Sequence, residues 1–396
     1  MRVGFDIGPI TRARSGVGNY CLELLRALLE IDGLDVSGFA ASTRRLDLEA
    51  LGRPLARRHL PVPTRVMYQV WSLLGMPAVD SMLGGVDVYH ATNYFLPPVK
   101  RAKRVLTIHD VAFKKHPELC SPKIVGPFSA KVAAFAREAD AVIADSESTR
   151  TDTIKLLGVK PERVHTVRLA VDWAFRPMPY EKAFEIVEKK YDIRRPYLLF
   201  VGTIEPRKNL LGLLKAFRQV RSQYPHQLVI AGAKGWGFNE VSNLAYGDDW
   251  GVLGESLAIG ELGVSGGVNR KLQDKLRQVI MTDYVEQMDM SALYRAADAF
   301  MFPSFYEGFG LPVLEAMACG CPVITANNSS LPEVGGDAAE YCDAHDVDSI
   351  ADAMRRVLSS AELREQMTQR GFAQAAKFSW KQTAEQTAAV YRSVCG

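Results

Sequence analysis

Short, apolar runs alternate with longer amphipathic stretches along most of the chain, and this alternation constrains the fold more than any other feature. In the first half the runs are RVGFDI, VDVYHA, RVLTIHD and DAVIADS; in the second half they are PYLLFVGT, QLVIAGA, a weaker MTDYV, DAFMFPS and CPVITAN. Such runs are typical of strands in parallel sheets, and the stretches between them suit crossover helices. The sequence therefore predicts an α/β protein with two Rossmann-like, doubly wound parallel sheets.

A charged segment punctuated by three prolines, at 177, 179 and 196, separates the two series of runs. This composition is usual for a connection between domains, and a length of 396 residues fits two domains. We therefore expect one domain over residues 1–175 and a second over residues 176–378. The last stretch, 379–396, has helical spacing and is expected to cross back to the first domain.

Composition excludes several classes of protein. With 47% hydrophobic and 23% charged residues, neither a disordered chain nor a membrane channel is expected. The start, MRVGFDIGPI, is typical of a strand and lacks the features of a signal peptide, which predicts a cytoplasmic protein. Nucleic-acid binding is not expected, because the pI is only 8.4 and the second half is slightly acidic.

The net charge of +3 conceals an asymmetry between the halves. Residues 1–175 carry 24 Lys/Arg against 18 Asp/Glu, and the remainder carries 24 against 27. A basic first domain fits an anionic partner such as a lipid headgroup or a pyrophosphate-linked acceptor, although solvated surface charges explain the difference equally well.

No metal site is predicted. Among the six cysteines, the closest pair is Cys319 and Cys321, which we expect to be ordinary buried thiols. Asp346 and Asp348 form a DxD pattern but stand before a helical stretch, which favours N-capping. The other acidic pair, at 248–249, lies in a stretch with seven glycines, 241–269, which predicts an irregular insertion.

A glycine-rich turn joins a predicted strand to a predicted helix in the second half. The segment SFYEGFGLPVLEAMACG begins at Ser304, and Gly308, Gly310 and Pro312 define its turn. Glycine lets the backbone approach a ligand, and proline suits the first turn of a helix. The free N–H groups of that helical turn favour an anion such as a diphosphate. The sequence therefore predicts a phosphate-binding helix N-terminus.

Two glutamates flank this turn. Glu307 comes just before it, and Glu315 follows eight residues later, in the expected first turn of the helix. Carboxylates accept hydrogen bonds from vicinal hydroxyls, so Glu315 is placed to bind a ribose and Glu307 to face a sugar. The alternative is that Glu315 is only favoured by the helix dipole and Glu307 is a surface loop residue.

The pattern EGFGLPxLEAMACGxPVI resembles the signature of family 4 glycosyltransferases, which have the GT-B fold of two Rossmann-like domains facing across a cleft. The resemblance covers essentially the whole chain and implies a retaining, nucleotide-sugar-dependent glycosyltransferase. It implies that the first domain, 1–175, binds the acceptor and that the second, 176–378, binds the nucleotide-sugar donor. It implies that Glu307 contacts hydroxyls of the donor sugar and that Glu315 binds the nucleotide ribose. The remaining donor-binding residues implied in this segment are Ser304, Gly308, Phe309, Gly310 and Leu311.

A basic pair, Arg207 and Lys208, follows a strand in VGTIEPRKNL and is expected to open a helix. Two cations there oppose the helix dipole unless an anion lies close by; a solvated pair is the alternative. The resemblance implies that the pair neutralises the donor diphosphate, beside Gly202 and Thr203. Many members of the family have a further arginine where Thr203 stands, so the pair must carry more of that work.

His109 and Asp110 stand at the carboxyl end of RVLTIHD. A buried structural histidine is the commoner role of a single histidine. The sequence resembles the family's His-Asp element, which implies that His109 lies near the donor sugar and is needed for turnover. Asp110 is assigned to acceptor binding.

The loop TRARSGVGNY follows the first run and resembles half of a dinucleotide fingerprint. Cys21 stands where a third small residue is needed, and no acid is placed to bind a ribose, so NAD is not expected. In family 4 the same loop faces the reaction centre. This implies donor contacts from Gly16, Val17 and Gly18, and acceptor or phosphate contacts from Arg12 and Arg14.

The motifs SGVGNY, TIHDV and LVIAGAKGWGF resemble bacterial mannosyltransferases of surface-polysaccharide assembly. The expected donor is GDP-mannose, with GDP-rhamnose or a UDP- or ADP-hexose as alternatives, and the expected acceptor is a growing glycan on a polyprenyl diphosphate. No cofactor beyond the nucleotide-sugar co-substrate is expected. A catalytically silent sugar-nucleotide-binding subunit is the alternative from another class, and the intact motif residues speak against it.

No carboxylate pair presents itself as nucleophile and acid about 5 Å apart, so a front-face reaction is preferred to a double displacement. The run RRHLPVPTRVMYQVWSLLGMPAV mixes Arg57, Arg58 and Arg65 with large apolar residues. It fits a peripheral surface for a lipid on the inner face of the membrane, or equally an amphipathic core helix.

Overall fold

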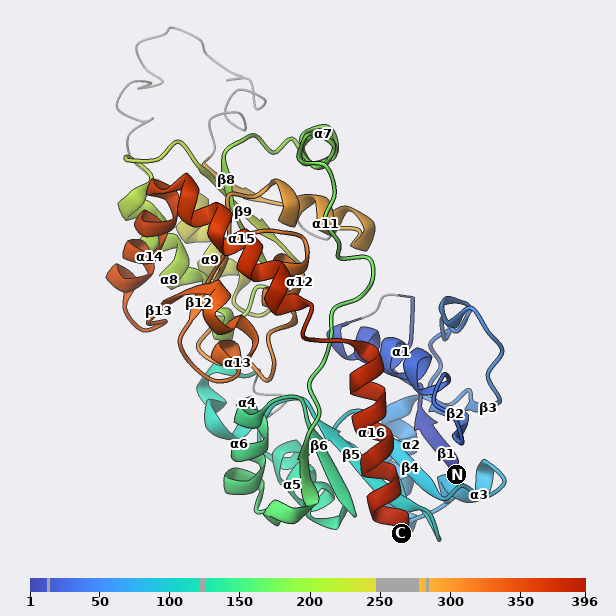
Figure 1. Cartoon of the computed structure of the whole chain (residues 1–396). Helices are drawn as coiled ribbons and strands as arrows, with labels where there is room; N and C mark the ends of the chain where they lie inside the picture. Colours follow the sequence, from blue (N-terminus) through green and yellow to red (C-terminus); the bar gives the residue numbers. More distant parts are fainter. Residues whose placement is uncertain (13–14, 122–124, 247–277, 283–284) are drawn as a thin grey trace, which may run out of the picture. The chain divides into compact units, whose positions relative to one another are not determined.

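The computed structural model describes residues 1–12, 15–121, 125–246, 278–282 and 285–396 (Figure 1). The chain divides into two compact units, Met1–Asp172 with Phe378–Gly396, and Trp173–Lys377. The sequence predicted these domain boundaries between residues 175 and 176 and between residues 378 and 379. Each unit contains one parallel sheet with helices, so the predicted fold class is confirmed.

The first sheet has the strand order β3-β2-β1-β4-β5-β6-β7, with every neighbouring pair parallel. Its strands are β1 (Arg2–Asp6), β2 (Asp35–Ala41), β3 (Arg57–Leu60), β4 (Val88–Ala91), β5 (Lys103–Ile108), β6 (Ala141–Ala144) and β7 (Val164–Thr166). The four predicted runs form β1, β4, β5 and β6. The other three strands were missed: β3 and β7 are short edge strands, and β2 is rich in small residues with low strand propensity.

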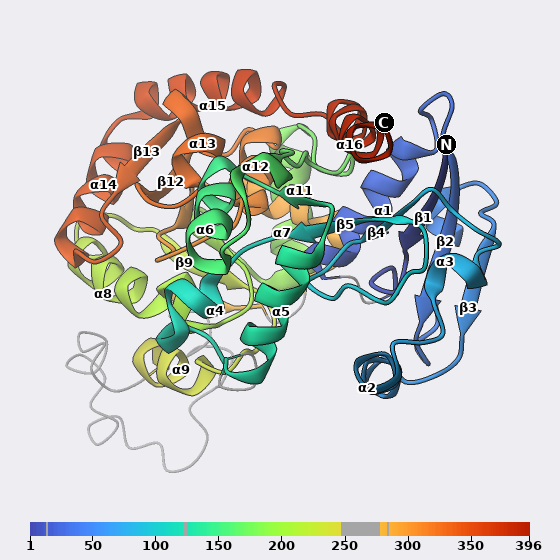
Figure 2. The same cartoon turned by 90° about the horizontal axis from the view of Figure 1, so that it is seen from below.

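The helices of the first unit are α1 (Gly16–Leu28), α2 (Thr64–Leu74), α3 (Val79–Met82), α4 (Ala112–Lys115), α5 (Pro127–Glu138), α6 (Glu147–Leu157) and α16 (Trp380–Cys395). Helix α16, capped by Ser379, packs beside α1 (Figures 1 and 2). The basic, apolar run expected to form one surface or helix is instead β3 followed by α2. Pro61 and Pro63 prevent a helix from continuing through the run, because proline lacks the backbone donor.

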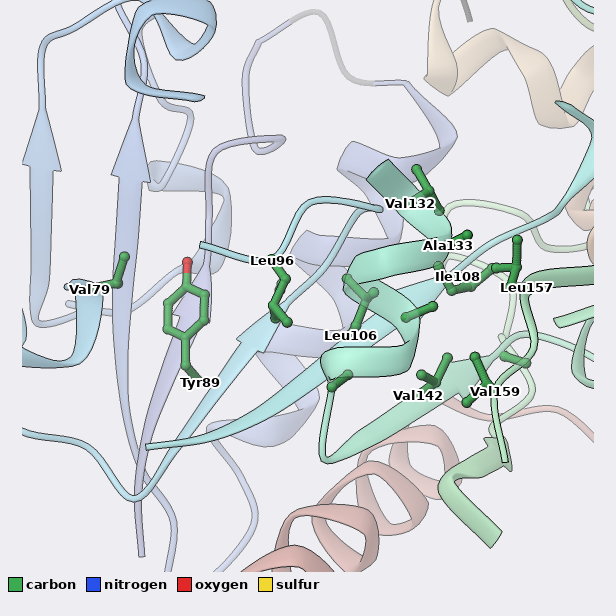
Figure 3. Packing of buried hydrophobic residues seen from close by; sticks show 14 of the residues in the cluster. Val79, Tyr89, Leu96, Leu106, Ile108, Val132, Ala133, Val142, Leu157 and Val159 are labelled. Atoms are coloured by element: carbon green, nitrogen blue, oxygen red, sulfur yellow. The ribbon is translucent and has the colours of Figure 1, made fainter. Parts of the chain in front are cut away.

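One hydrophobic cluster of the first unit lies on one face of its sheet (Figure 3). The cluster includes Tyr89 from β4, Leu106 from β5, Leu157 from α6 and Leu96, and Val142 from β6 lies near Val159. These side chains are almost fully removed from solvent. Their burial fixes the strand ends from which the loops of this unit depart.

The second sheet has the order β10-β9-β8-β11-β12-β13, again parallel throughout. Its strands are β8 (Tyr197–Val201), β9 (Gln227–Ala231), β10 (Val279–Met281), β11 (Ala299–Phe302), β12 (Val323–Ala326) and β13 (Ala339–Cys342). Strand β10 comes earlier than the predicted MTDYV, which shares only Met281 with it. Strand β13 was missed because most of its residues are half-buried and include a glutamate.

The helices of the second unit are α7 (Tyr180–Tyr191), α8 (Leu210–Val220), α9 (Phe238–Tyr246), α11 (Gln287–Ala296), α12 (Leu311–Ala318), α13 (Leu331–Gly335), α14 (Val347–Ser359) and α15 (Ala361–Ala375). Helices α12, α13 and α15 pack side by side (Figures 1 and 2). Because α9 is helical to 246, the expectation of irregular backbone from 241 is wrong for its first six residues. The rest of the glycine-rich stretch, with the acidic pair at 248–249, lies outside the described residues.

The structure also bears on the cysteine pair, the DxD pattern and the possibility of a membrane-spanning helix. Cys319 and Cys321 are buried free thiols, as predicted. Asp346 caps α14 by accepting a hydrogen bond from the Asp348 N–H at 2.9 Å, also as predicted. Within the described residues, no helix is long and apolar enough to cross a membrane.

Candidate active site

The two donor motifs lie on adjacent loops of the second unit. One loop follows β8 and contains Arg207 and Lys208; the other follows β11 and contains Glu307. Strands β8 and β11 are parallel neighbours, so both loops leave the same edge of the sheet, where ligands bind in open α/β folds. A backbone hydrogen bond of 2.9 Å from the Phe305 N–H to the Arg207 carbonyl joins them.

Arg207, Lys208 and Glu307 form a buried charge cluster. Nζ of Lys208 lies 2.7 Å from Oε1 of Glu307, and Nη1 of Arg207 lies 2.8 Å from Oε2. The other arm of Arg207, Nη2, lies 2.8 Å from Oε1 of Glu205. Glu307 is 6% exposed and Lys208 is 9% exposed. Neither a solvated basic pair nor a surface glutamate describes these residues.

The environment of the cluster favours the charged form of Glu307. Burial alone would raise the pKa of this carboxyl, but the Arg207 and Lys208 cations outweigh burial and lower the pKa below its ordinary value. Burial and the neighbouring Arg207 cation lower the pKa of Lys208, against the opposing effect of Glu307. Glu307 is therefore an anion whose position is set by two cations of the other loop.

The basic pair does not open a helix, contrary to the sequence prediction. It lies in a 3₁₀ turn, Pro206–Lys208, and α8 begins only after Asn209, which has a left-handed φ of 55°. The Asn209 side chain caps α8 and donates to the carbonyls of Pro303 (3.1 Å) and Ala344 (2.7 Å). Glu205 and Glu307, rather than a bound anion alone, offset the two cations. Sequence reasoning missed Asn209, which ties this loop to the one after β11.

The loop from Ser304 to Gly310 is held by a polar segment that sequence reasoning also missed. Asn328 donates to the Ser304 carbonyl at 3.1 Å, and the Ser329 hydroxyl accepts from the Glu307 N–H at 3.0 Å. The Ser330 hydroxyl lies 3.0 Å and 2.7 Å from the carbonyls of Glu307 and Phe309. The signal was the run NNSS directly after a predicted strand.

The turn into α12 has the expected geometry, with one correction. Gly310 adopts a φ of 106°, which glycine tolerates, and Pro312 lies at the start of the helix that Leu311 begins. Glu315 is the fifth residue of α12 and thus lies in its second turn, not its first. The helix dipole therefore does not explain its presence, because that effect is confined to the first turn.

Glu315 has a partner that the sequence did not reveal. The hydroxyl of Tyr294, a fully buried residue of α11, donates to Oε2 of Glu315 at 2.9 Å. Burial and the Glu315 carboxylate hold the pKa of Tyr294 well above its ordinary value, so the phenol remains a donor. Tyr294 therefore orients the Glu315 carboxylate, which the sequence predicts to bind a ribose.

His109 follows β5 in the first unit and is fully engaged. Nδ1 lies 2.8 Å from Oδ2 of Asp145, and Nε2 lies 2.9 Å from the carbonyl oxygen of Thr92. Both partners accept hydrogen bonds, so both ring nitrogens are assigned protons. Burial would lower the pKa of His109, but the Asp145 carboxylate more than compensates and raises it. The two acceptors and the raised pKa both favour the protonated ring. Asp145 was missed, although it follows a predicted strand.

The other candidates of the first unit have local structural partners. The Asp110 carboxylate accepts from the Ala112 N–H at 3.0 Å, at the start of α4. The glycine loop, Gly16 to Gly18, forms the first turn of α1, and Ser15 caps it by accepting from the Gly18 N–H at 3.4 Å. Val17 lines a cavity of this unit. Gly202 follows the end of β8 and has a φ of 148°. Arg12 and Thr203 are exposed, and Arg14 lies outside the described residues.

Two parallel-sheet units, one carrying a cationic cluster and a helix N-terminus at its strand edge, define the GT-B class of glycosyltransferases. Residues 14–175 match the model described as Glycosyltransferase Family 4, and residues 195–360 match the model described as Glycosyl transferases group 1. The chain is 32% identical over 415 residues to an Escherichia coli O-antigen chain mannosyltransferase B, covering 99% of this chain and 100% of the relative. The chain belongs to glycosyltransferase family 4.

A second relative agrees with this assignment, and a solved structure agrees with the fold. The serotype-specific mannosyltransferase WbdA of Escherichia coli is 31% identical over 285 residues, which cover 71% of this chain and 32% of that longer protein. The crystal structure of Anabaena HepE in complex with UDP and glucose superposes with a TM-score of 0.72 at 17% identity, covering 99% of this chain and all of that one. The predicted enzyme class is confirmed.

Proposed function

We propose that this glycosyltransferase moves a mannosyl group from GDP-mannose to a growing, lipid-linked glycan and retains the anomeric configuration. The observation that carries the proposal is the buried cluster of Arg207, Lys208 and Glu307 at the strand edge. The choice of mannose rests on the full-length similarity to an O-antigen chain mannosyltransferase. The proposed place of action is the inner face of the cytoplasmic membrane.

The donor contacts follow from the chemistry of the cluster and of α12. Arg207 and Lys208 provide the positive charge for a diphosphate, and the N–H groups that open α12 after Gly310 add partial positive charge. Glu315, oriented by Tyr294, accepts hydrogen bonds from the ribose hydroxyls. Glu307 accepts from hydroxyls of the sugar while its two cations keep it ionised.

In the proposed reaction, the bond between the anomeric carbon and the donor phosphate oxygen breaks as the acceptor oxygen bonds to the same face of the sugar. The acceptor hydroxyl proton passes to the departing phosphate oxygen. The two cations stabilise the negative charge that develops on the diphosphate. Electrostatic stabilisation of this kind is usually the largest single contribution to catalysis. His109 carries protons on both ring nitrogens and so supplies a fixed charge rather than a base.

Because Arg207 and Lys208 neutralise the leaving group, we propose that transfer requires no metal ion. The measurement is the rate of transfer after dialysis against EDTA. An unchanged rate supports the proposal. A loss of transfer that Mg²⁺ or Mn²⁺ restores would overturn it.

The donor is tested by offering the full chain a panel of GDP-, UDP- and ADP-sugars and measuring both thermal stabilisation and transfer to a mannose-terminated acceptor. GDP-mannose is expected to stabilise the fold, since a ligand that binds the native state raises its stability. Lys208→Ala is expected to lose about 100-fold in transfer, whereas Lys215→Ala, an exposed lysine of α8, should match the wild type. Stabilisation and turnover by UDP-sugars alone would contradict the mannosyl assignment.

Helix α2 supports the lipid-linked acceptor. It buries Met67 and Trp71 but leaves Leu73 and Leu74 exposed by 82% and 67%, and the following Met76 by 60%. Three exposed arginines lie nearby in sequence, at 57, 58 and 65. Exposed apolar side chains with neighbouring cations are the composition of a surface that binds anionic lipid.

Sedimentation with vesicles of phosphatidylglycerol and phosphatidylethanolamine tests this surface. The double variant Leu73→Glu/Leu74→Glu is expected to stay in the supernatant, because it removes apolar area and adds repulsive charge. The control is Leu156→Glu, on α6, where the leucine is also exposed, by 39%. Equal sedimentation of both variants would refute membrane binding through α2.

A further inference from the structure

Helix α16 reaches the core of the first unit through a chain of buried hydrogen bonds. Nδ1 of His90, on β4, lies 2.7 Å from the hydroxyl of Tyr391, although 301 residues separate the two in sequence. Nε2 of His90 lies 2.7 Å from Oγ1 of Thr107, on β5, and that oxygen lies 2.9 Å from the hydroxyl of Tyr20, on α1. Side chains of α16, β4, β5 and α1 are thus joined in series.

This hydrogen-bond chain is closed to solvent. His90, Thr107 and Tyr391 are 0% exposed, and Tyr20 is 2% exposed. Burial and the neighbouring His109 lower the pKa of His90 to about 3, so the His90 ring is neutral, with one nitrogen that donates and one that accepts. In a buried chain of this kind each hydrogen bond polarises the next, so the loss of one hydroxyl changes the bonds further along.

The Tyr20 end of the hydrogen-bond chain lies against His109. The two rings meet edge to face, with centroids 4.8 Å apart and an interplanar angle of 82°. The Tyr94 ring also packs edge-on to His109, with centroids 6.2 Å apart. Aromatic rings prefer such edge-to-face contacts, and a shift of one ring displaces the other. The position of Tyr20 therefore contributes to the position of the His109 ring.

Helix α16 contacts this group of residues at two points. It packs beside α1 (Figure 1), where Ala384 and Ala388 are fully buried. The ring of Trp380, the first residue of α16, lies 6.4 Å from the Tyr20 ring, measured between centroids. The hydrogen bond from Tyr391 follows about three turns later. Both ends of α16 are thus linked to Tyr20, directly or through the hydrogen-bond chain.

Attachment of α16 alone does not require this arrangement. The Thr383 hydroxyl attaches the helix more simply, by donating to the Arg168 carbonyl at 2.8 Å. An apolar side chain in place of His90 would fill the same space, whereas a buried imidazole is stable only while its polar atoms are paired. The hydrogen-bond chain ends beside His109, a residue with a role in the proposed reaction.

We propose that α16 positions the His109 ring for transfer through this hydrogen-bond chain, and that Tyr391 and His90 are positioning residues of the reaction. Both act through Thr107 and Tyr20 on the ring that supplies a fixed charge. The assignment rests on the proposed function, because it concerns the part that His109 plays in that reaction. It gives the last helix of the protein a role in the rate of transfer as well as in the fold.

The test combines kinetics with NMR of the full, histidine-labelled chain. Tyr391→Phe keeps the ring and removes the hydroxyl. We expect kcat to fall about tenfold with little change in either KM, because a displaced charge stabilises the transition state less well. The ring-nitrogen signals of His109, assigned with His109→Gln, should shift in the same variant.

The matched control is Thr387→Val, also on α16. The Thr387 hydroxyl is equally buried but donates to the Thr383 carbonyl at 2.8 Å, outside the hydrogen-bond chain. Thr387→Val should lose stability, as a buried hydroxyl pair is lost, yet keep the wild-type kcat and His109 signals. Equal losses of kcat in Thr387→Val and Tyr391→Phe would show that α16 has only a structural role.

A double-mutant cycle tests whether the effect passes through Tyr20. Tyr20→Phe removes the hydrogen bond to Thr107 but keeps the ring that packs on His109. Adding Tyr391→Phe to Tyr20→Phe should cause no further loss of kcat, because the connection is already broken. Losses that add in full, or His109 signals that do not move in Tyr391→Phe, would overturn the proposal.

The outcomes separate this proposal from the proposed function. Suppose that the wild type transfers from no donor, while the His109 signals shift in Tyr391→Phe and not in Thr387→Val. The proposed function then fails, and the control of the His109 ring by α16 stands. If transfer proceeds and kcat is unchanged in Tyr391→Phe, the positioning role fails alone.

Discussion

Nζ of Lys208 lies 2.7 Å from Oε1 of Glu307, although 99 residues separate them in the chain. The contact links the loops after β8 and β11, and Arg207 reinforces it from the same side with a 2.8 Å contact to Oε2. A carboxylate buried to this degree is stable only when such partners compensate its charge. The cluster is therefore the proposed donor site, and it also holds the two loops together.

The first prediction concerns removal of the charge of Glu307. Glu307→Gln removes the carboxylate that Arg207 and Lys208 share, so we expect a loss of about 3 kcal/mol in the free energy of unfolding. Urea denaturation measures this loss. Glu181→Gln is the control, because Glu181 is 80% exposed and its 3.3 Å pair with Arg195 should contribute little.

The same variant changes the response to acid. The pKa of Glu307 lies below its ordinary value of 4.5 in the folded state, so its contribution to stability is fully present above 4.5. That contribution is lost as the pH falls through the folded pKa. The stability difference between wild type and Glu307→Gln should therefore shrink as the pH falls below 4.5. A difference that stays constant from neutral pH to acid would show that Glu307 is not held as an anion.

The second prediction tests the role of Tyr294. Tyr294→Phe removes the hydroxyl that orients Glu315, so the donor KM should rise about tenfold with a smaller change in kcat. Tyr197→Phe is a matched control, because Tyr197 is equally buried and its hydroxyl donates to the Leu293 carbonyl at 2.7 Å. Both variants should lose about 1 kcal/mol of stability. Equal effects of the two variants on the donor KM would refute an orienting role.

The sequence predicted the strands that are apolar throughout, such as β8 and β11, because burial on both faces leaves a continuous run. It missed β2, whose small residues give no such run; a Cβ on Gly38 would lie 2.8 Å from Ile7. A pattern of hydrophobic residues identifies strands of the core, but it does not identify a strand whose small residues serve close packing.

For the candidate site, the motif residues were predicted and their partners were not. Glu307 and Lys208 stand in recognisable motifs. Tyr294 is one of several buried residues of α11, and only the fold places its hydroxyl beside Glu315. Asp145 likewise lies 36 residues from His109. Contacts between distant segments depend on strand order, and no local pattern encodes that order.

The third prediction contrasts two buried histidines. The Asp145 carboxylate raises the pKa of His109 above its ordinary value of 6.5 despite burial. Burial lowers the pKa of His90 to about 3, because its partners are the hydroxyls of Tyr391 and Thr107 rather than an anion. NMR of histidine-labelled protein should show His109 titrating above 6.5 and His90 remaining neutral at moderately acid pH.

Asp145→Asn supplies the test of cause. It removes the anion, so the pKa of His109 should fall below that of the wild type. A raised histidine pKa contributes stability that is fully present below 6.5 and is lost as the pH rises through the folded value. The stability difference between wild type and Asp145→Asn should therefore be larger near pH 6 than near pH 9. A His109 titration that does not respond to Asp145→Asn would refute the pairing.

The last prediction concerns Asp6, whose pKa burial raises from 3.8 to about 6. A raised carboxyl pKa means that ionisation opposes folding. The penalty is absent below 3.8, grows as the pH rises to about 6 and is constant above that value. Among the groups that face Asp6, Tyr68, Tyr89 and Cys21 have raised pKa values and stay neutral over this range. Asp6 and the cationic side chain of Arg44 line one cavity of the first unit.

Asp6→Asn removes the penalty and keeps an acceptor for the Gly8 N–H. The variant should therefore be more stable than the wild type by about 1–2 kcal/mol at pH 8, less than the full shift implies because the carboxylate is only partly buried. At pH 3.5 the two proteins should be equally stable. Urea denaturation at both pH values measures the difference. A variant that is less stable at pH 8 would show that Asp6 is a structural anion, whereas the expected gain marks a carboxylate retained against its own stability, as binding sites often require.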